Sequence, residues 1–192
     1  MRKLFVGILV SCVMLNGIVA CAGETESGAT ELKWEDFVAL NDAADEDIIS
    51  QGDFVTFDEI ACQMWVPNVM KAVELTDEDV EAGYIGYFST EDEENVAAVM
   101  YVDVDGMDLD GYIEYLAGED DVEEVARMTI NGLPAVSYDM PEKDTTCVAF
   151  ETEAGYILEF SFAPMSDENY QGIIAFMGGS IQPADVEEST EA

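Results

Sequence analysis

The chain contains no histidine and very few basic residues. Six lysines and arginines stand against 43 aspartates and glutamates in 192 residues, which gives a formal net charge of −37 at pH 7. The absence of histidine excludes histidine-based catalytic triads and removes the commonest side-chain ligand of transition metals. The negative charge disfavours direct binding to nucleic acid and to anionic lipid headgroups, because both would be repelled.

Recognisable catalytic patterns are also absent from the sequence. No glycine-rich phosphate-binding loop with a nearby lysine follows a predicted strand. Carboxylates are so abundant that a general acid and base pair could be assembled almost anywhere. Their presence is therefore no evidence for a catalytic site. We therefore expect no enzymatic activity and no cofactor. Glycan hydrolysis by two carboxylates is the one catalytic alternative that the composition leaves open.

The amino-terminal residues have the order of a secretory signal. Arg2 and Lys3 precede an apolar run from Leu4 to Leu15, and Ile18-Val19-Ala20-Cys21 follows. These last four residues resemble a bacterial lipobox. The resemblance implies that a diacylglycerol is attached to the Cys21 sulfur and that the chain is cleaved before it. An uncleaved transmembrane anchor is the alternative, but the apolar run is shorter than the roughly 20 residues that a spanning helix needs.

These features predict a protein held at the extracytoplasmic face of a bacterial cell membrane, with the lipid bilayer as its partner through acylated Cys21. Two acyl chains give a stable anchor where one would not. We divide the chain into a signal peptide (1–20), a lipid-anchored flexible linker (21–31), a globular domain (32–183) and an acidic disordered tail (184–192). We expect a monomer.

Two cysteines remain in the globular domain, Cys62 and Cys147, both inside strand-like runs. Export permits a disulfide between them, and their separation in sequence says nothing about their distance. We favour two reduced thiols in the core, because cysteine is among the residue types most often buried.

Hydrophobic periodicity predicts helices and strands through the whole domain. We expect helices at 32–41, 77–82 and 109–116, and a last helix that Ser166 caps and Gly178-Gly179 end. The run 109–116 has one apolar stripe, with Asp108 as its cap. The expected strands are 54–57, 60–66, 84–90, 96–104, 122–130, 133–138, 145–152 and 156–162.

The run Val96–Val102 is apolar at nearly every position, so both faces of this strand should be buried. Hairpin-linked strands indicate an antiparallel sheet, and a strand without a polar face requires a layer on each side. The predicted fold class is therefore α+β, an antiparallel sheet of about 6–8 strands covered by helices on both faces.

Several local motifs in 54–182 resemble the PsbP-like α/β/α sandwich of small secreted and lipid-anchored bacterial proteins. The motifs are Trp65-Val66-Pro67, the 109–116 helix, Asn131-Gly132-Leu133, Gly155-Tyr156-Ile157-Leu158, and the closing helix that leads to Ser180-Ile181. The resemblance implies the same sandwich. It transfers no catalytic residue, because the family has no common catalytic constellation.

Four aspartates around Gly106 superficially resemble a calcium loop. They are Asp103, Asp105, Asp108 and Asp110. Aligned on Gly111, the pattern has Gly106 at its first position and Ala117 at its twelfth, where an EF-hand loop has acids. We favour helix capping and turn formation for these residues, and keep a weak hard-cation site as the alternative.

Aromatic residues suggest a possible carbohydrate-stacking surface, but packing is the preferred interpretation. Tyr112 and Tyr156 lie on apolar stripes and should be in the core, whereas Tyr115 and Tyr87 fall off these stripes and could be exposed. Trp65 either packs under a covering helix or forms an exposed anchor. Overall, the sequence predicts a non-enzymatic surface lipoprotein that binds an unidentified protein or small molecule or acts structurally, with a calcium-binding module as the alternative.

Overall fold

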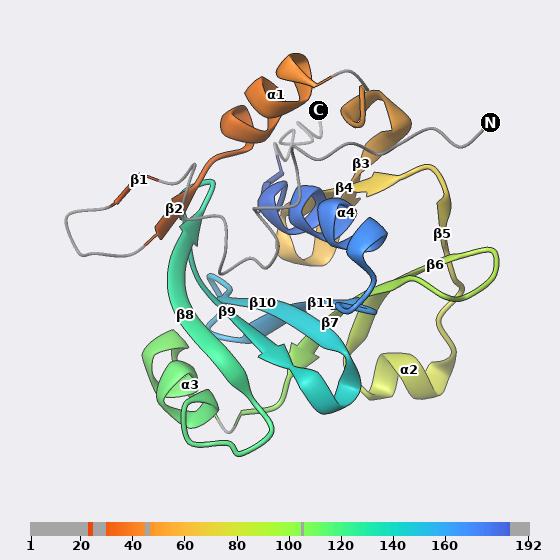
Figure 1. The fold of residues 1–192 in the computed structure, drawn as a ribbon. Helices are drawn as coiled ribbons and strands as arrows, with labels where there is room; N and C mark the ends of the chain where they lie inside the picture. The colour runs from red at the N-terminus through yellow and green to blue at the C-terminus, as the bar shows by residue number, and fades with distance from the viewer. Residues whose placement is uncertain (1–22, 25–29, 45–46, 105, 185–192) are drawn as a thin grey trace, which may run out of the picture.

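The computed structural model describes residues 23–24, 30–44, 47–104 and 106–184. Figure 1 shows the arrangement of its elements. The helices are α1 (Trp34–Ala43), α2 (Asp77–Glu81), α3 (Leu109–Leu116) and α4 (Glu168–Gly179). The strands are β1 (Gly23–Glu24), β2 (Thr30–Leu32), β3 (Gly52–Phe57), β4 (Cys62–Pro67), β5 (Met70–Ala72), β6 (Tyr84–Thr90), β7 (Val96–Val102), β8 (Glu123–Ile130), β9 (Leu133–Met140), β10 (Thr145–Glu151), β11 (Ile157–Ala163) and β12 (Gln182–Pro183).

The central element is a nine-stranded sheet with the order β1-β2-β8-β9-β10-β11-β7-β6-β5. Its neighbouring strands pair antiparallel, except that β2 runs parallel to β8. Three hairpins build most of it, β6–β7, β8–β9 and β10–β11, and β11 then pairs with β7. Long-range pairing of β7 with β11 places both strands near the middle of the sheet, as the unbroken apolar run of β7 predicts.

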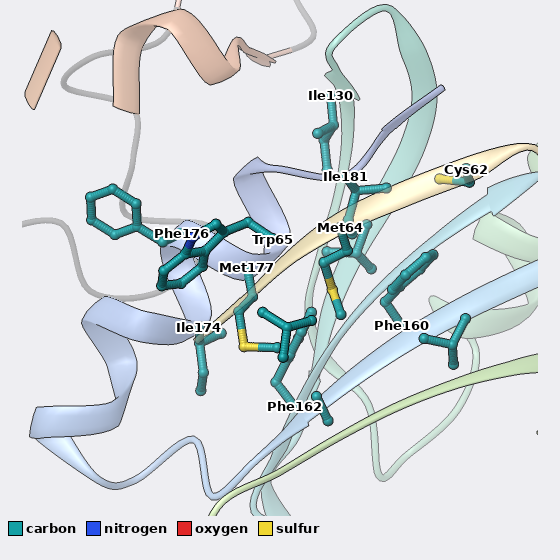
Figure 2. Close-up of a cluster of buried hydrophobic side chains, with 14 of the residues drawn as sticks. Cys62, Met64, Trp65, Ile130, Phe160, Phe162, Ile174, Phe176, Met177 and Ile181 are labelled. Atoms are coloured by element: carbon teal, nitrogen blue, oxygen red, sulfur yellow. The ribbon is translucent and has the colours of Figure 1, made fainter. Parts of the chain in front are cut away.

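One face of this sheet is covered by α4, α1 and a second, three-stranded sheet with the order β12-β4-β3. The larger hydrophobic cluster lies between these layers (Figure 2). Trp65 of β4 packs against Phe176 of α4, and only 1% of its surface is exposed. This settles the alternative that the sequence left open: Trp65 lies under a covering helix.

The opposite face is covered by α3. Alternate residues of β10 separate the two sides, since Val148 and Phe150 belong to the larger cluster whereas Cys147 and Ala149 belong to a smaller one with Leu109 of α3. Helices therefore lie on both faces, and the predicted α+β fold class is confirmed. The expected strands 54–57 and 60–66 exist, but as β3 and β4 they form the separate small sheet.

Side-chain caps explain where the helices begin. The Thr76 and Asp79 side chains form a capping box at α2, and Asp108 accepts a hydrogen bond from the Gly111 N–H at the start of α3. The Asp108 cap agrees with the sequence prediction. The last helix differs, because Asp167 rather than Ser166 accepts the capping hydrogen bond; the Ser166 hydroxyl donates to Asp144 instead.

The ends of the domain are tied together by one side chain. Asn131, in the β8–β9 turn, accepts a hydrogen bond from the Trp34 N–H (2.6 Å) and donates to the carbonyl oxygens of Gly179 (2.9 Å) and Ile181 (2.7 Å). The start of α1 and the end of α4 thus meet at the same amide. The Asn131-Gly132 turn that the sequence predicts is therefore also the point where α1 and α4 are joined.

The structure differs from the expected boundaries near the amino terminus. We expect a flexible linker at 21–31, yet Gly23–Glu24 pairs with β2, and Thr30 already lies in the sheet. Strand β5 was also not predicted. The predicted signal peptide (1–20), Cys21 and residues 185–192 of the predicted acidic tail lie outside the described residues.

Candidate functional site

The most unusual group of side chains lies beneath α3, inside the smaller cluster. Tyr112 of α3, Tyr138 of β9, Cys147 of β10 and Glu159 of β11 meet there. Glu159 is only 9% exposed, and the other three are buried more deeply. The strands position the group, because Tyr138 lies directly across from Cys147 and both point toward α3.

A directional chain of hydrogen bonds links the helix to the carboxyl group. The Tyr138 hydroxyl donates to Oε2 of Glu159. The Tyr112 hydroxyl lies 3.0 Å from the Tyr138 hydroxyl, and the two rings meet edge to face. Since the single proton of Tyr138 is directed at Glu159, Tyr112 donates to Tyr138.

Burial controls the protonation of this group. It raises the pKa of Glu159, and hydrogen bonds from Tyr138 and Cys147 only partly oppose the effect. Burial likewise raises the pKa of Tyr138, of Tyr112 and of the Cys147 thiol. Among the described residues no basic side chain forms an ion pair with Glu159. The arrangement is therefore suited to holding protons in the interior.

Three polar contacts hold α3 at its edges. Asp110 forms an ion pair with Arg127 of β8, and Oε2 of Glu151 accepts a hydrogen bond from the Leu109 N–H (3.1 Å). The Tyr112–Tyr138 hydrogen bond is the third, and the only one of the three that is buried. The helix thus rests on a small apolar cluster and is fastened to β8, β9 and β10.

Two of the four aspartates proposed as a weak cation site make other interactions. Asp108 caps α3, and Asp110 pairs with Arg127. Asp105 lies outside the described residues, and Asp103 follows β7 as an exposed residue. Within the described ranges, no three acidic or cysteine side chains are grouped so that they could hold a metal ion. The same ranges contain no helix with the length and apolar character needed to span a membrane.

The two cysteines of the domain are free and buried in different clusters, Cys62 with α4 and Cys147 beneath α3. The preferred interpretation as reduced core thiols agrees with this structure. Burial raises the pKa of Cys62 to about 11, so the thiol stays protonated and is a poor nucleophile at neutral pH.

The tyrosines follow the sequence prediction with one exception. Tyr112 is buried, Tyr115 is 46% exposed, and Tyr87 is half-buried. Tyr156, expected in the core, is 62% exposed and meets Tyr101 edge to face. The prediction was wrong because Tyr156 belongs to the β10–β11 turn, and the strand alternation starts only at Ile157.

Sequence reasoning missed Glu159 and Tyr138. One signal could have found the glutamate, since it is the only charged residue in Ile157–Ala163, a strand that otherwise has an apolar or small residue at each position. A charge within a strand that needs layers on both sides must be buried or lie at an edge.

Comparison with known proteins gives a similarity of fold. No family model matches the chain, and no curated protein matches it either. The structure is similar to the solution structure of cyanobacterial PsbP (CyanoP) from Synechocystis sp. PCC 6803. The TM-score is 0.49 and the sequence identity 11%, over 70% of this chain and 94% of that chain.

Proposed function

We propose that the protein is a non-enzymatic, lipid-anchored domain at the extracytoplasmic face of a bacterial membrane, where it binds a protein or small molecule or acts structurally. The observation that carries the proposal is the order of the first 21 residues: a basic start, a short apolar run, and Ile18-Val19-Ala20-Cys21. In this proposal the lipid attaches the protein to the membrane, and the globular domain provides the surface that binds a protein or small molecule.

The short stretch of sequence between Cys21 and strand β1 supports a role close to the membrane. Strand β1 begins at Gly23, so a single residue separates the proposed lipid-bearing cysteine from the first paired strand. A domain attached in this way stands next to the bilayer, and its acidic surface keeps it from lying flat on anionic headgroups.

The chemistry of the buried group supports a non-enzymatic role. Burial raises the pKa of Glu159, of Tyr138 and of Cys147, which favours the protonated, neutral form of each. Catalysis also requires access to a substrate, and each of these three side chains is buried. The alternative of a calcium-binding module has less support, because Asp108 and Asp110 are already engaged in capping and ion pairing.

The experiment that tests the proposal compares two cysteine substitutions in cells fed an alkyne-labelled fatty acid. Cys21→Ala should abolish labelling and either release the protein into the medium or leave it unprocessed. Cys12→Ala, within the same signal segment, is the matched control and should label and localise as the unaltered protein does. A Cys21→Ala protein that is still labelled, with unchanged mass and membrane retention, would contradict the proposed anchor.

A further inference from the structure

Glu159 lies at the inner end of a hydrogen-bonded chain whose outer end belongs to a helix. Its carboxyl group accepts from Tyr138, and Tyr138 accepts from Tyr112 of α3. A neutral carboxyl group is compatible with this interior. A charged one is costly there unless it is paired, and Lys143, the basic side chain that influences Glu159, lies beyond ion-pair distance.

The least costly way to hydrate an ionised Glu159 is to move α3. The strands that carry Glu159 and Tyr138 are held by pairing on both sides, β11 by β7 and β10, and β9 by β8 and β10. Helix α3, in contrast, covers a small cluster, and the described residues show three polar contacts between it and the sheet. Its local opening therefore exposes far less apolar surface than global unfolding does.

We propose that the protonation of Glu159 controls whether helix α3 stays docked on the sheet, so that this face of the domain is closed at acidic pH and opens as the pH rises. The closed state prefers the neutral carboxyl group. Closure is therefore complete below the ordinary pKa of a glutamate, 4.5, and weakens as the pH rises toward the raised value of the closed state.

Burial also raises the pKa of Asp139 in β9, which acts on Cys147. Four groups act directly on the pKa of Glu159. They are Tyr138 of β9, Cys147 of β10, Tyr112 of α3 and, at longer range, Lys143. Burial keeps the hydroxyls and the thiol protonated well above neutral pH. From β7, the residue paired with Glu159 is Met100, which does not titrate. This behaviour belongs to the folded domain and does not depend on the lipid anchor.

Hydrogen exchange measured by mass spectrometry on the purified full-length protein tests whether the protonation of Glu159 controls the docking of α3. After correction for intrinsic rates, the opening constant of the 109–116 amides should rise between pH 5 and pH 8, by up to about tenfold per pH unit. Glu159→Gln is nearly isosteric and carries no charge, so it should abolish the rise. Glu114→Gln removes an exposed charge from α3 itself and should behave as the unaltered protein does. Parallel pH profiles for Glu159→Gln and the unaltered protein would overturn the proposal.

A second measurement needs no substitution and covers the case in which Glu159→Gln does not fold. Cys147 lies under α3 and Cys62 lies in the other cluster, so their labelling rates report two different openings at the same pH. With dithiodipyridine, which reacts with thiols at acidic pH, the rate ratio of Cys147 to Cys62 should rise severalfold from pH 5 to pH 8. A constant or falling ratio would overturn the proposal.

Discussion

Gly179, the last residue of α4, provides a quantitative test of how α1 is attached. A Cβ atom built at this position lies 2.3 Å from two carbons of the Phe37 ring, whereas ordinary contacts begin at 3.4 Å. Phe37 is the buried aromatic residue of α1 and packs against Phe176. In Gly179→Ala the ring must retreat by about 1.1 Å or leave its position.

We expect Gly179→Ala to destabilise the domain by about 1–3 kcal/mol, the usual cost of overpacking a core. The matched control is Gly172→Ala in the same helix, where a Cβ atom meets nothing within 4 Å. There the higher helix propensity of alanine should stabilise by about 0.5–1 kcal/mol. Because 1 kcal/mol shifts Tm by about 2–4 °C in a domain of this size, the two substitutions should move Tm in opposite directions.

A double-mutant cycle identifies the cause of the stability loss in Gly179→Ala. Phe37→Ala alone should cost about 3–5 kcal/mol, and on that background Gly179→Ala should cost nothing further, because the ring that it displaces is gone. Urea unfolding at constant m-value measures all four free energies. If Gly179→Ala is as stabilising as Gly172→Ala, or if its cost persists without the Phe37 ring, the packing of α1 described above is refuted.

Three further substitutions, together with one control, test hydrogen bonds. Ser180→Ala leaves the buried Trp65 N–H without its acceptor (2.8 Å), and thermal unfolding should show a loss of about 1–3 kcal/mol. Tyr138→Phe breaks the buried chain and should cost a similar amount in urea unfolding, whereas Tyr115→Phe, at an exposed position, should stay within about 0.5 kcal/mol of the unaltered protein. Asp108→Ala removes the cap of α3 and should cost about 1 kcal/mol; equal stability of the alanine variant would show that the cap contributes nothing.

Local signals explain which elements could be predicted. The helix Leu109–Leu116 has the predicted bounds because an apolar stripe, a capping aspartate and a following glycine all agree. The Asn131-Gly132 turn is equally local. Strand β5 has only three residues at an edge of the sheet, too few for an alternating pattern to be recognised.

The candidate site could not be predicted because its contacts are non-local. Tyr112 and Glu159 are 47 positions apart, and they meet only once β9, β10 and β11 pair in register. No pattern within either segment indicates the other. The division of strands between two sheets is also non-local, since β3 and β4 have ordinary strand periodicity and β4 pairs with β12 from the far end of the domain.

The junction at Asn131 also has a chemical consequence. Asn–Gly is a labile pair in polypeptides, because the backbone nitrogen of an unhindered glycine readily attacks the preceding side-chain amide and expels ammonia. The product is a succinimide, and water opens this ring to aspartate or isoaspartate. The three hydrogen bonds to Trp34, Gly179 and Ile181 hold the amide of Asn131 in place, and the native fold therefore slows its own deamidation. An aspartate there would direct a carboxylate at the carbonyl oxygens of Gly179 and Ile181 and repel them. Deamidation of Asn131 would therefore weaken the contact that joins both ends of the domain.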